Sequence, residues 1–193
     1  MSALQTELSA NSAGVADRDR REAVPLVNIL AFPDQELSII TEGIRKVQFS
    51  PYLLKWIEAY ETAGQRGRFL WQCCLKGVEI TTLPCVKPEL RQHVMETKML
   101  SILFGTLIDD IADREQDRDM LEMAITMASE DWPEERLELW DTRRRACLEV
   151  IARIWSEVWS RCKTYPRFSE FEQLLRFDNA QILNAMRFAL LLN

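Results

Sequence analysis

The chain has 193 residues, of which 47% are hydrophobic and 28% are charged, and its formal net charge is −6. This size and composition indicate one soluble globular domain with its own hydrophobic core. Binding to nucleic acid is disfavoured, because affinity for a phosphate backbone depends on clustered cations and the sequence contains no basic stripe. No apolar run is long enough to span a bilayer and no signal peptide is visible, so we expect a cytoplasmic protein.

Helix-forming residues dominate the sequence, glycine is scarce, and strand signals are almost absent, which together predict an all-α fold. Residues 1–24 are small, polar and charged, and we expect them to form a mobile N-terminal tail. The helical domain is expected to occupy residues 25–193. Its first segment contains two prolines and is predicted to be irregular before a short helix.

Three predicted helices follow in chain order, at residues 50–64, 67–83 and 88–113. Each has a boundary signal: a proline in the first turn of the first helix, a proline directly after the second, and Pro88 at the start of the third. The third helix is apolar on all sides between Met99 and Ile108, which is typical of a helix buried in the core.

Three more helices are predicted at residues 117–129, 133–166 and 169–193. The second is expected to be one long amphipathic helix that ends at a proline, and the third to begin with Ser169 as its N-cap. The sequence ends in NAMRFALLLN, an apolar helical stretch without a C-cap. We therefore expect the chain to be truncated within a larger α domain.

Four aspartates stand at the end of the apolar helix, in the stretch LFGTLIDDIADREQD. Asp109, Asp113 and Asp117 are spaced four residues apart and share one helix face, whereas Asp110 is rotated by about 100°. The C-terminal end of a helix carries partial negative charge, so carboxylates there need cations. Ligands that are all oxygen favour Mg²⁺. The alternative is a solvated helix end whose charges pair with nearby arginines.

LIDDIADREQD resembles the DDxxD motif of class I terpene synthases of the bacterial type, and the resemblance extends over most of the chain. It implies a partial class I terpenoid synthase helical bundle. The implied activity is a Mg²⁺-dependent cyclase that ionises a linear prenyl diphosphate, such as farnesyl or geranylgeranyl diphosphate, and cyclises the carbocation. Three Mg²⁺ ions, or Mn²⁺, would bind the diphosphate.

The resemblance also implies roles for individual residues. Asp109 and Asp113 correspond to the catalytic metal ligands of the motif. Asp110 and Asp117 are weaker metal candidates, and we expect Asp110 to pair with an arginine instead. Arg187 is the candidate diphosphate-sensing arginine. Arg176 is the alternative, although it is expected to be a solvated neighbour of an aspartate.

Three aromatic residues are candidates for the wall of the substrate pocket: Phe104, Phe69 and Trp71. Aromatic faces stabilise cations, which gives them a role in a cyclase, but aromatic residues at helical spacing also form ordinary cores.

One feature departs from the resemblance. The second metal motif of the family, Nxxx(S/T)xxxE, is not found after Arg187, so we expect little cyclase activity from this chain alone. A chain-elongating isoprenyl diphosphate synthase is a less favoured alternative, because its motif is usually followed by an arginine pair and a glycine. The other alternative is a non-catalytic helical interaction module or an inactive fragment. A homodimer is possible in each case.

Overall fold

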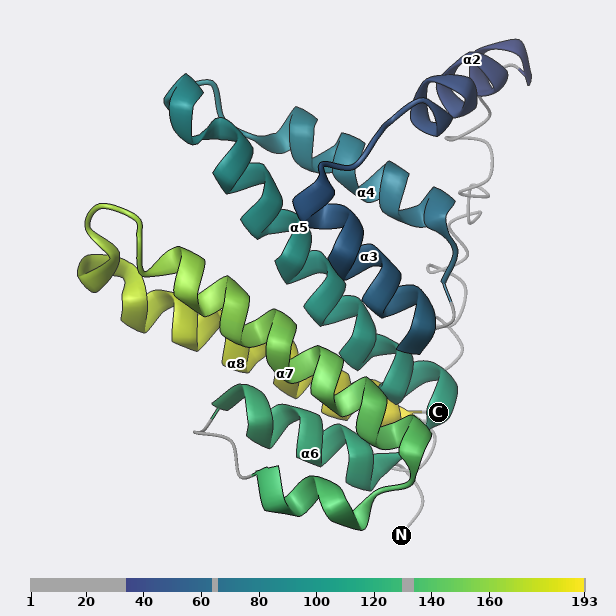
Figure 1. Ribbon diagram of the computed structural model, residues 1–193, viewed down its shortest axis with the longest axis vertical. Helices are drawn as coiled ribbons and strands as arrows, with labels where there is room; N and C mark the ends of the chain where they lie inside the picture. Colours follow the sequence, from purple (N-terminus) through teal and green to yellow (C-terminus); the bar gives the residue numbers. More distant parts are fainter. Residues whose placement is uncertain (1–33, 64–65, 130–133, 193) are drawn as a thin grey trace, which may run out of the picture. The chain divides into compact units, whose positions relative to one another are not determined.

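The computed structural model describes residues 34–63, 66–129 and 134–192, and every element within these ranges is helical (Figure 1). The predicted all-α fold is confirmed for this part of the chain. The elements are, in order, α2 (Asp34–Arg45), α3 (Pro51–Ala63), α4 (Arg68–Thr81), α5 (Pro88–Asp110), the π-helix η2 (Ile111–Glu115), α6 (Arg118–Ser129), the 3₁₀-helix η3 (Glu134–Leu139), α7 (Thr142–Cys162) and α8 (Phe168–Leu192). The predicted tail at residues 1–24 lies outside the described residues. None of the described helices combines the length and the apolar character needed to cross a bilayer.

The chain divides into two compact units, Met1–Glu42 and Gly43–Asn193, and the second contains α3 to α8. The central helix of this second unit is α5, which packs against α3, α4, α7 and α8 and runs between α4 and α7 in Figure 1. Its buried apolar side chains are Met99, Leu100, Leu103, Phe104, Leu107 and Ile108. Burial of this stretch on several sides agrees with its apolar character on all faces.

The predicted single helix over residues 133–166 is wrong. The structure has the short 3₁₀-helix η3 and then α7, which begins only at Thr142. Asp141 is the N-cap of α7, because its Oδ1 atom accepts the backbone N–H groups of Arg143 and Arg144, both at 3.0 Å. A capping residue has non-helical backbone angles, so the aspartate that starts α7 also ends any continuation from η3.

The start of α8 also differs from the prediction. The helix begins at Phe168, so Ser169 lies inside its first turn and is not the N-cap. Arg167, directly before the helix, has a positive φ of 66°. Its backbone carbonyl accepts the N–H of Glu170 at 2.9 Å, which is the bond that opens the helix. Pro166 precedes this turn and cannot continue α7 as a hydrogen-bond donor.

Gly105 lies in the middle of α5, and apart from the adjacent residues and the backbone of the helix itself, no described atom lies within 4 Å of the position that a Cβ atom would occupy. We therefore expect Gly105→Ala to raise the free energy of unfolding by roughly 0.5–1 kcal/mol, because alanine is the better helix former. Urea denaturation measures this change. Gly77→Ala, in a similarly open position of α4, should give a comparable gain. A loss of stability at Gly105 alone would mean that another group approaches the backbone there.

Candidate functional site

The aspartate motif lies where α5 changes from an α-helix into the π-helix η2. The α-helix ends at Asp110, η2 covers Ile111–Glu115, and Gln116 then has left-handed backbone angles, with a φ of 51°. A single π-turn at the end of an α-helix is rare and occurs frequently at functional sites. Its wider turn also changes the alignment of Asp113 with Asp109 from the one expected of a regular α-helix.

Arg66 joins the first two aspartates of the motif. It lies in the connection between α3 and α4, directly before Gly67, the N-cap of α4. Its Nη2 atom is 2.8 Å from Oδ2 of Asp109, and its Nε atom is 2.9 Å from Oδ1 of Asp110. One guanidinium therefore compensates the charges of two neighbouring carboxylates at the negative end of α5.

The carboxylate of Asp110 is buried and is held by neighbouring side chains. Its Oδ2 atom accepts the hydroxyl of Tyr60 at 2.6 Å, and Arg114 is 3.3 Å from Oδ1 in addition to Arg66. The expected pairing of Asp110 with an arginine is confirmed. Burial, together with the hydrogen bond to Asp110, raises the pKa of Tyr60, so the phenol stays protonated and donates to the carboxylate.

Asp109 and Asp113 are the more accessible carboxylates of the motif. The side chain of Asp109 is 35% exposed, and Asp113 is exposed. Burial raises the pKa of Asp109, and the negative charge of Asp113 raises it further, whereas Arg66 acts in the opposite direction. The charge of Asp113 thus disfavours ionisation of Asp109, and a divalent cation bound beside both carboxylates would offset this effect.

Mg²⁺ in proteins is usually held by one or two carboxylates and completes its shell with water and phosphate oxygens, so the number and type of these two side chains agree with what one hydrated Mg²⁺ ion takes. Among the residues that the structure describes, no three histidine, cysteine or acidic side chains come together as a metal cage. The three-ion arrangement implied by the resemblance would therefore need ligands beyond this cluster.

Asp117 has a capping role that the sequence analysis missed. Its Oδ1 atom accepts the backbone N–H of Met120 at 3.0 Å, as the N-cap of α6, and its Oδ2 atom is 2.7 Å from Arg144. The sequence signal was available, because an aspartate at the start of a predicted helix is a preferred N-cap.

Arg187 lies near the end of the motif but is engaged by another carboxylate. Its Nε and Nη2 atoms lie 2.8 and 2.7 Å from the two carboxylate oxygens of Glu122, and its Nη1 atom donates to Oδ1 of Asn184 at 2.8 Å. It borders a pocket of about 400 Å³ that is lined by Gln116, Arg118, Glu122, Arg187, Leu190 and Leu191. The structure thus brings Arg187 to the residue that follows η2.

Arg176 has a different neighbour from the expected one. Its guanidinium donates to Glu172, at 2.9 Å from Nη2, and lies 4.4 Å from the ring centroid of Trp159. This arginine is therefore held on the surface of α8 and α7.

The three aromatic candidates lie in different environments. Phe104 is buried in the core and stacked on Trp155, with 4.7 Å between ring centroids. Trp71 is fully buried with its ring 4.4 Å from that of Tyr60, and its indole N–H has no hydrogen-bond partner among the described residues. Phe69 is 44% exposed, beside Arg45. Core packing explains Phe104, and Trp71 is the candidate that lies closest to the aspartate network, through Tyr60.

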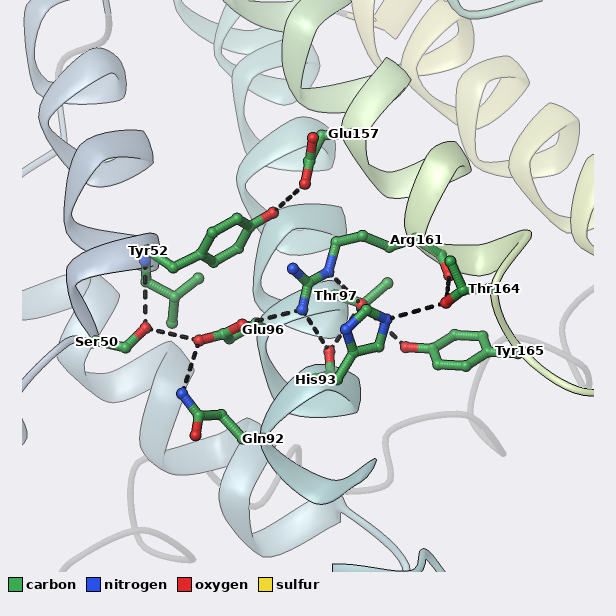
Figure 2. A network of polar contacts seen from close by, with 11 residues as sticks. Ser50, Tyr52, Gln92, His93, Glu96, Thr97, Glu157, Arg161, Thr164 and Tyr165 are labelled. Carbon is green, nitrogen blue, oxygen red and sulfur yellow. Dashed lines mark hydrogen bonds and ion pairs between the residues drawn. The ribbon is translucent and has the colours of Figure 1, made fainter. Parts of the chain in front are cut away.

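A second polar cluster, near the start of α5, was not foreseen (Figure 2). Glu96 is buried, and its two carboxylate oxygens accept the hydroxyl of Ser50 at 2.7 Å, the amide of Gln92 at 3.1 Å and the Nη2 atom of Arg161 at 3.0 Å. This cluster borders a pocket of about 410 Å³ that is lined by Gln48, Ser50, Leu53, Leu75, Pro88, Arg91, Gln92, Met95 and Glu96.

Arg161 links three helices in this cluster. Figure 2 shows its guanidinium between the ring of Tyr52 and the α5 residues, with 4.4 Å to the ring centroid. It also donates to Oγ1 of Thr97 and to the carbonyl of His93, both at 3.0 Å. Tyr165 donates to the same threonine oxygen at 2.9 Å. These polar groups form their hydrogen bonds with one another, so the cluster holds α3, α5 and α7 in a fixed position relative to one another.

Comparison of the chain with protein-family models gave no match. Searches of curated proteins and of solved structures also gave no significant match. Any function therefore has to be argued from the site itself.

We expect Tyr60→Phe to lower the free energy of unfolding by about 1–3 kcal/mol, because it leaves the buried carboxylate of Asp110 without one of its donors. Thermal or urea unfolding measures the loss. Tyr52→Phe is the matched control: its hydroxyl donates to Glu157 at 2.6 Å in a partly exposed site, where water can replace it. Equal losses in the two variants would contradict the claim that the hydrogen bond to Asp110 stabilises the fold more than the hydrogen bond to Glu157 does.

Proposed function

We propose that the chain is a helical diphosphate-binding domain of the class I terpene synthase type. In this proposal Asp109 and Asp113 hold Mg²⁺ against the diphosphate of a prenyl substrate, and Asp110 fixes the end of α5. The proposal is carried by one observation: of the three carboxylates at the end of the buried helix, Asp110 is fully engaged, whereas Asp109 is partly exposed and Asp113 is exposed.

Each residue of the motif then has a distinct role. Tyr60 and Arg114 hold Asp110 and so fix the direction of the helix end. Asp109 and Asp113 present oxygen ligands, and the bound metal would stabilise the negative charge that develops on the leaving diphosphate. The guanidinium of Arg66 forms an ion pair with Asp109, so a metal ion would have to displace Arg66 or share the carboxylate with it. Arg187 would have to exchange Glu122 for a phosphate oxygen.

A second candidate function, the non-catalytic interaction module, is favoured by the same ion pairs. Arg66 already compensates Asp109 and Asp110, and Arg187 already has a carboxylate partner. An interaction module of this kind needs no metal. The aspartates at the end of α5 would then serve only as a hydrated, charged surface. The two candidates differ in whether Mg²⁺ and diphosphate bind together at Asp109 and Asp113.

The proposal predicts that Mg²⁺ with inorganic diphosphate raises the melting temperature of the chain. At a hundredfold excess over the dissociation constant the stabilisation is about 2.7 kcal/mol, which corresponds to several degrees for a chain of this size. Differential scanning calorimetry measures the shift. Asp113→Asn should abolish it, because the second carboxylate ligand is lost.

Asp117→Asn is the matched control for this measurement. Asparagine caps helices as well as aspartate does, so α6 keeps its N-cap, and the same charge is removed outside the proposed metal ligands. The shift should persist in this variant. The interaction-module candidate is supported if the wild-type chain shows no shift, and the assignment of ligands is wrong if both variants lose it.

Without metal, Asp113→Asn should raise the stability of the chain slightly at neutral pH. The pKa of Asp109 is raised in the folded state, chiefly by burial and next by Asp113. A carboxyl group whose pKa is raised in the folded state lowers the free energy of unfolding at a pH above that pKa. This loss of stability disappears as the pH falls through the folded pKa. Removal of the Asp113 charge reduces this loss at neutral pH, so the difference in melting temperature from wild type should shrink on acidification. A difference that grows on acidification would contradict this sign.

A further inference from the structure

α8 carries apolar side chains on two opposite faces. Its inner face contains Leu183, which is buried, and Leu175, Met186 and Leu190, which are partly buried against the core. Its outer face contains large apolar side chains that are exposed in the part of the chain that the structure describes. A helix that is apolar on both faces is typically covered on both. The outer face of α8 therefore needs a partner.

The outer face forms a regular stripe. Its apolar members are 61, 60, 66 and 72% exposed, and they are Leu174, Phe177, Phe188 and Leu191 in that order. Gln181 and Asn184, also exposed, fill the middle of the stripe. The spacing alternates between three and four residues throughout, which is the pattern of the a and d positions of a coiled coil.

The stripe is symmetric about the point between Ile182 and Leu183. The two leucines, the two phenylalanines and the two amide residues of the stripe each lie at equal distances on either side of this point. If two copies of α8 lie antiparallel with these midpoints opposite, leucine meets leucine, phenylalanine meets phenylalanine, and Gln181 meets Asn184. A shift of register would place an amide against an apolar side chain, so the central polar pair selects this register.

We propose that the stripe Leu174, Phe177, Gln181, Asn184, Phe188 and Leu191 is the interface of an antiparallel homodimer of this chain. Opposite helix dipoles favour this orientation. Each phenylalanine offers roughly 100 Å² of exposed surface, and the leucines offer similar areas. The stripes of two copies together approach the lower limit of about 1,000 Å² for a specific interface, which predicts a reversible dimer of modest affinity. This proposal does not depend on the proposed function.

Sedimentation velocity of the full chain over the micromolar range tests the proposal. We expect a concentration-dependent dimer, and we expect Phe177→Glu and Phe188→Glu each to raise its dissociation constant at least about tenfold, because a charge is buried in the interface. Both side chains are exposed in the monomer, and circular dichroism checks that the variants fold. Ile80→Glu, at a 73% exposed apolar residue of α4, is the matched control and should leave the dimer unchanged.

Disulfide cross-linking tests the register. Leu174 and Leu191 are about 25 Å apart along one helix, which is too far for a disulfide within one chain. An equimolar mixture of Leu174→Cys and Leu191→Cys should form a disulfide between residues 174 and 191, identified by mass spectrometry of the linked peptides, and neither variant alone should link to itself at these positions. The proposal is overturned if the wild-type chain stays monomeric, if Ile80→Glu dissociates the dimer as the α8 variants do, or if residue 174 links to residue 174.

Discussion

The fold of the second unit depends on how the negative end of α5 is compensated. Hydrophobic burial places the C-terminal part of this helix, from Met99 onward, in the core, and its last residue, Asp110, is buried as well. A buried carboxylate at the C-terminal end of a helix is opposed both by desolvation and by the helix dipole. Tyr60 and Arg66, from α3 and the α3–α4 connection, and Arg114, from η2, supply the compensation. The network therefore also fixes how α3 and α4 meet the end of α5.

A corresponding constraint exists near the other end of the same helix. Glu96 is buried there and is compensated by Arg161 from α7, with Ser50 and Gln92 as further donors (Figure 2). Between these two polar clusters the buried side chains of α5 are apolar, and apolar contacts alone do not fix the position of a helix along its axis. Directional hydrogen bonds at both ends do fix it, because a shift would leave a buried charge unpaired. The apolar core thus holds α5 in place, and the polar clusters fix its register.

Local signals in the sequence predicted most of the helices, because prolines and apolar periodicity act over short distances. They failed at two helix starts: the side chain of Asp141 caps α7 and divides the predicted helix over residues 133–166, and a backbone turn at Arg167 sets the start of α8. In the site, helical spacing predicted that Asp109 and Asp113 share one face, but Asp113 lies in the π-helix η2, which changes that alignment. The pairing of Arg66 with Asp109 and Asp110 could not be predicted, because that arginine is more than forty residues away in the sequence and only the packing of α4 on α5 brings it near.

The two candidate functions, an enzyme and a non-catalytic interaction module, differ in whether a metal ion can replace Arg66 at Asp109. The guanidinium of Arg66 is shared between a buried carboxylate, Asp110, and a partly exposed one, Asp109. The bond to Asp110 is the one that folding requires, because an unpaired buried charge is strongly unfavourable. The bond to Asp109 contributes less, since water reaches that carboxylate and screens the ion pair. Under the proposed function, a divalent cation would replace the contact with Asp109 and leave the contact with Asp110 in place. The two ion pairs of Arg66 would then keep the helix end folded before a metal binds, and Asp109 would be the carboxylate whose partner is exchanged.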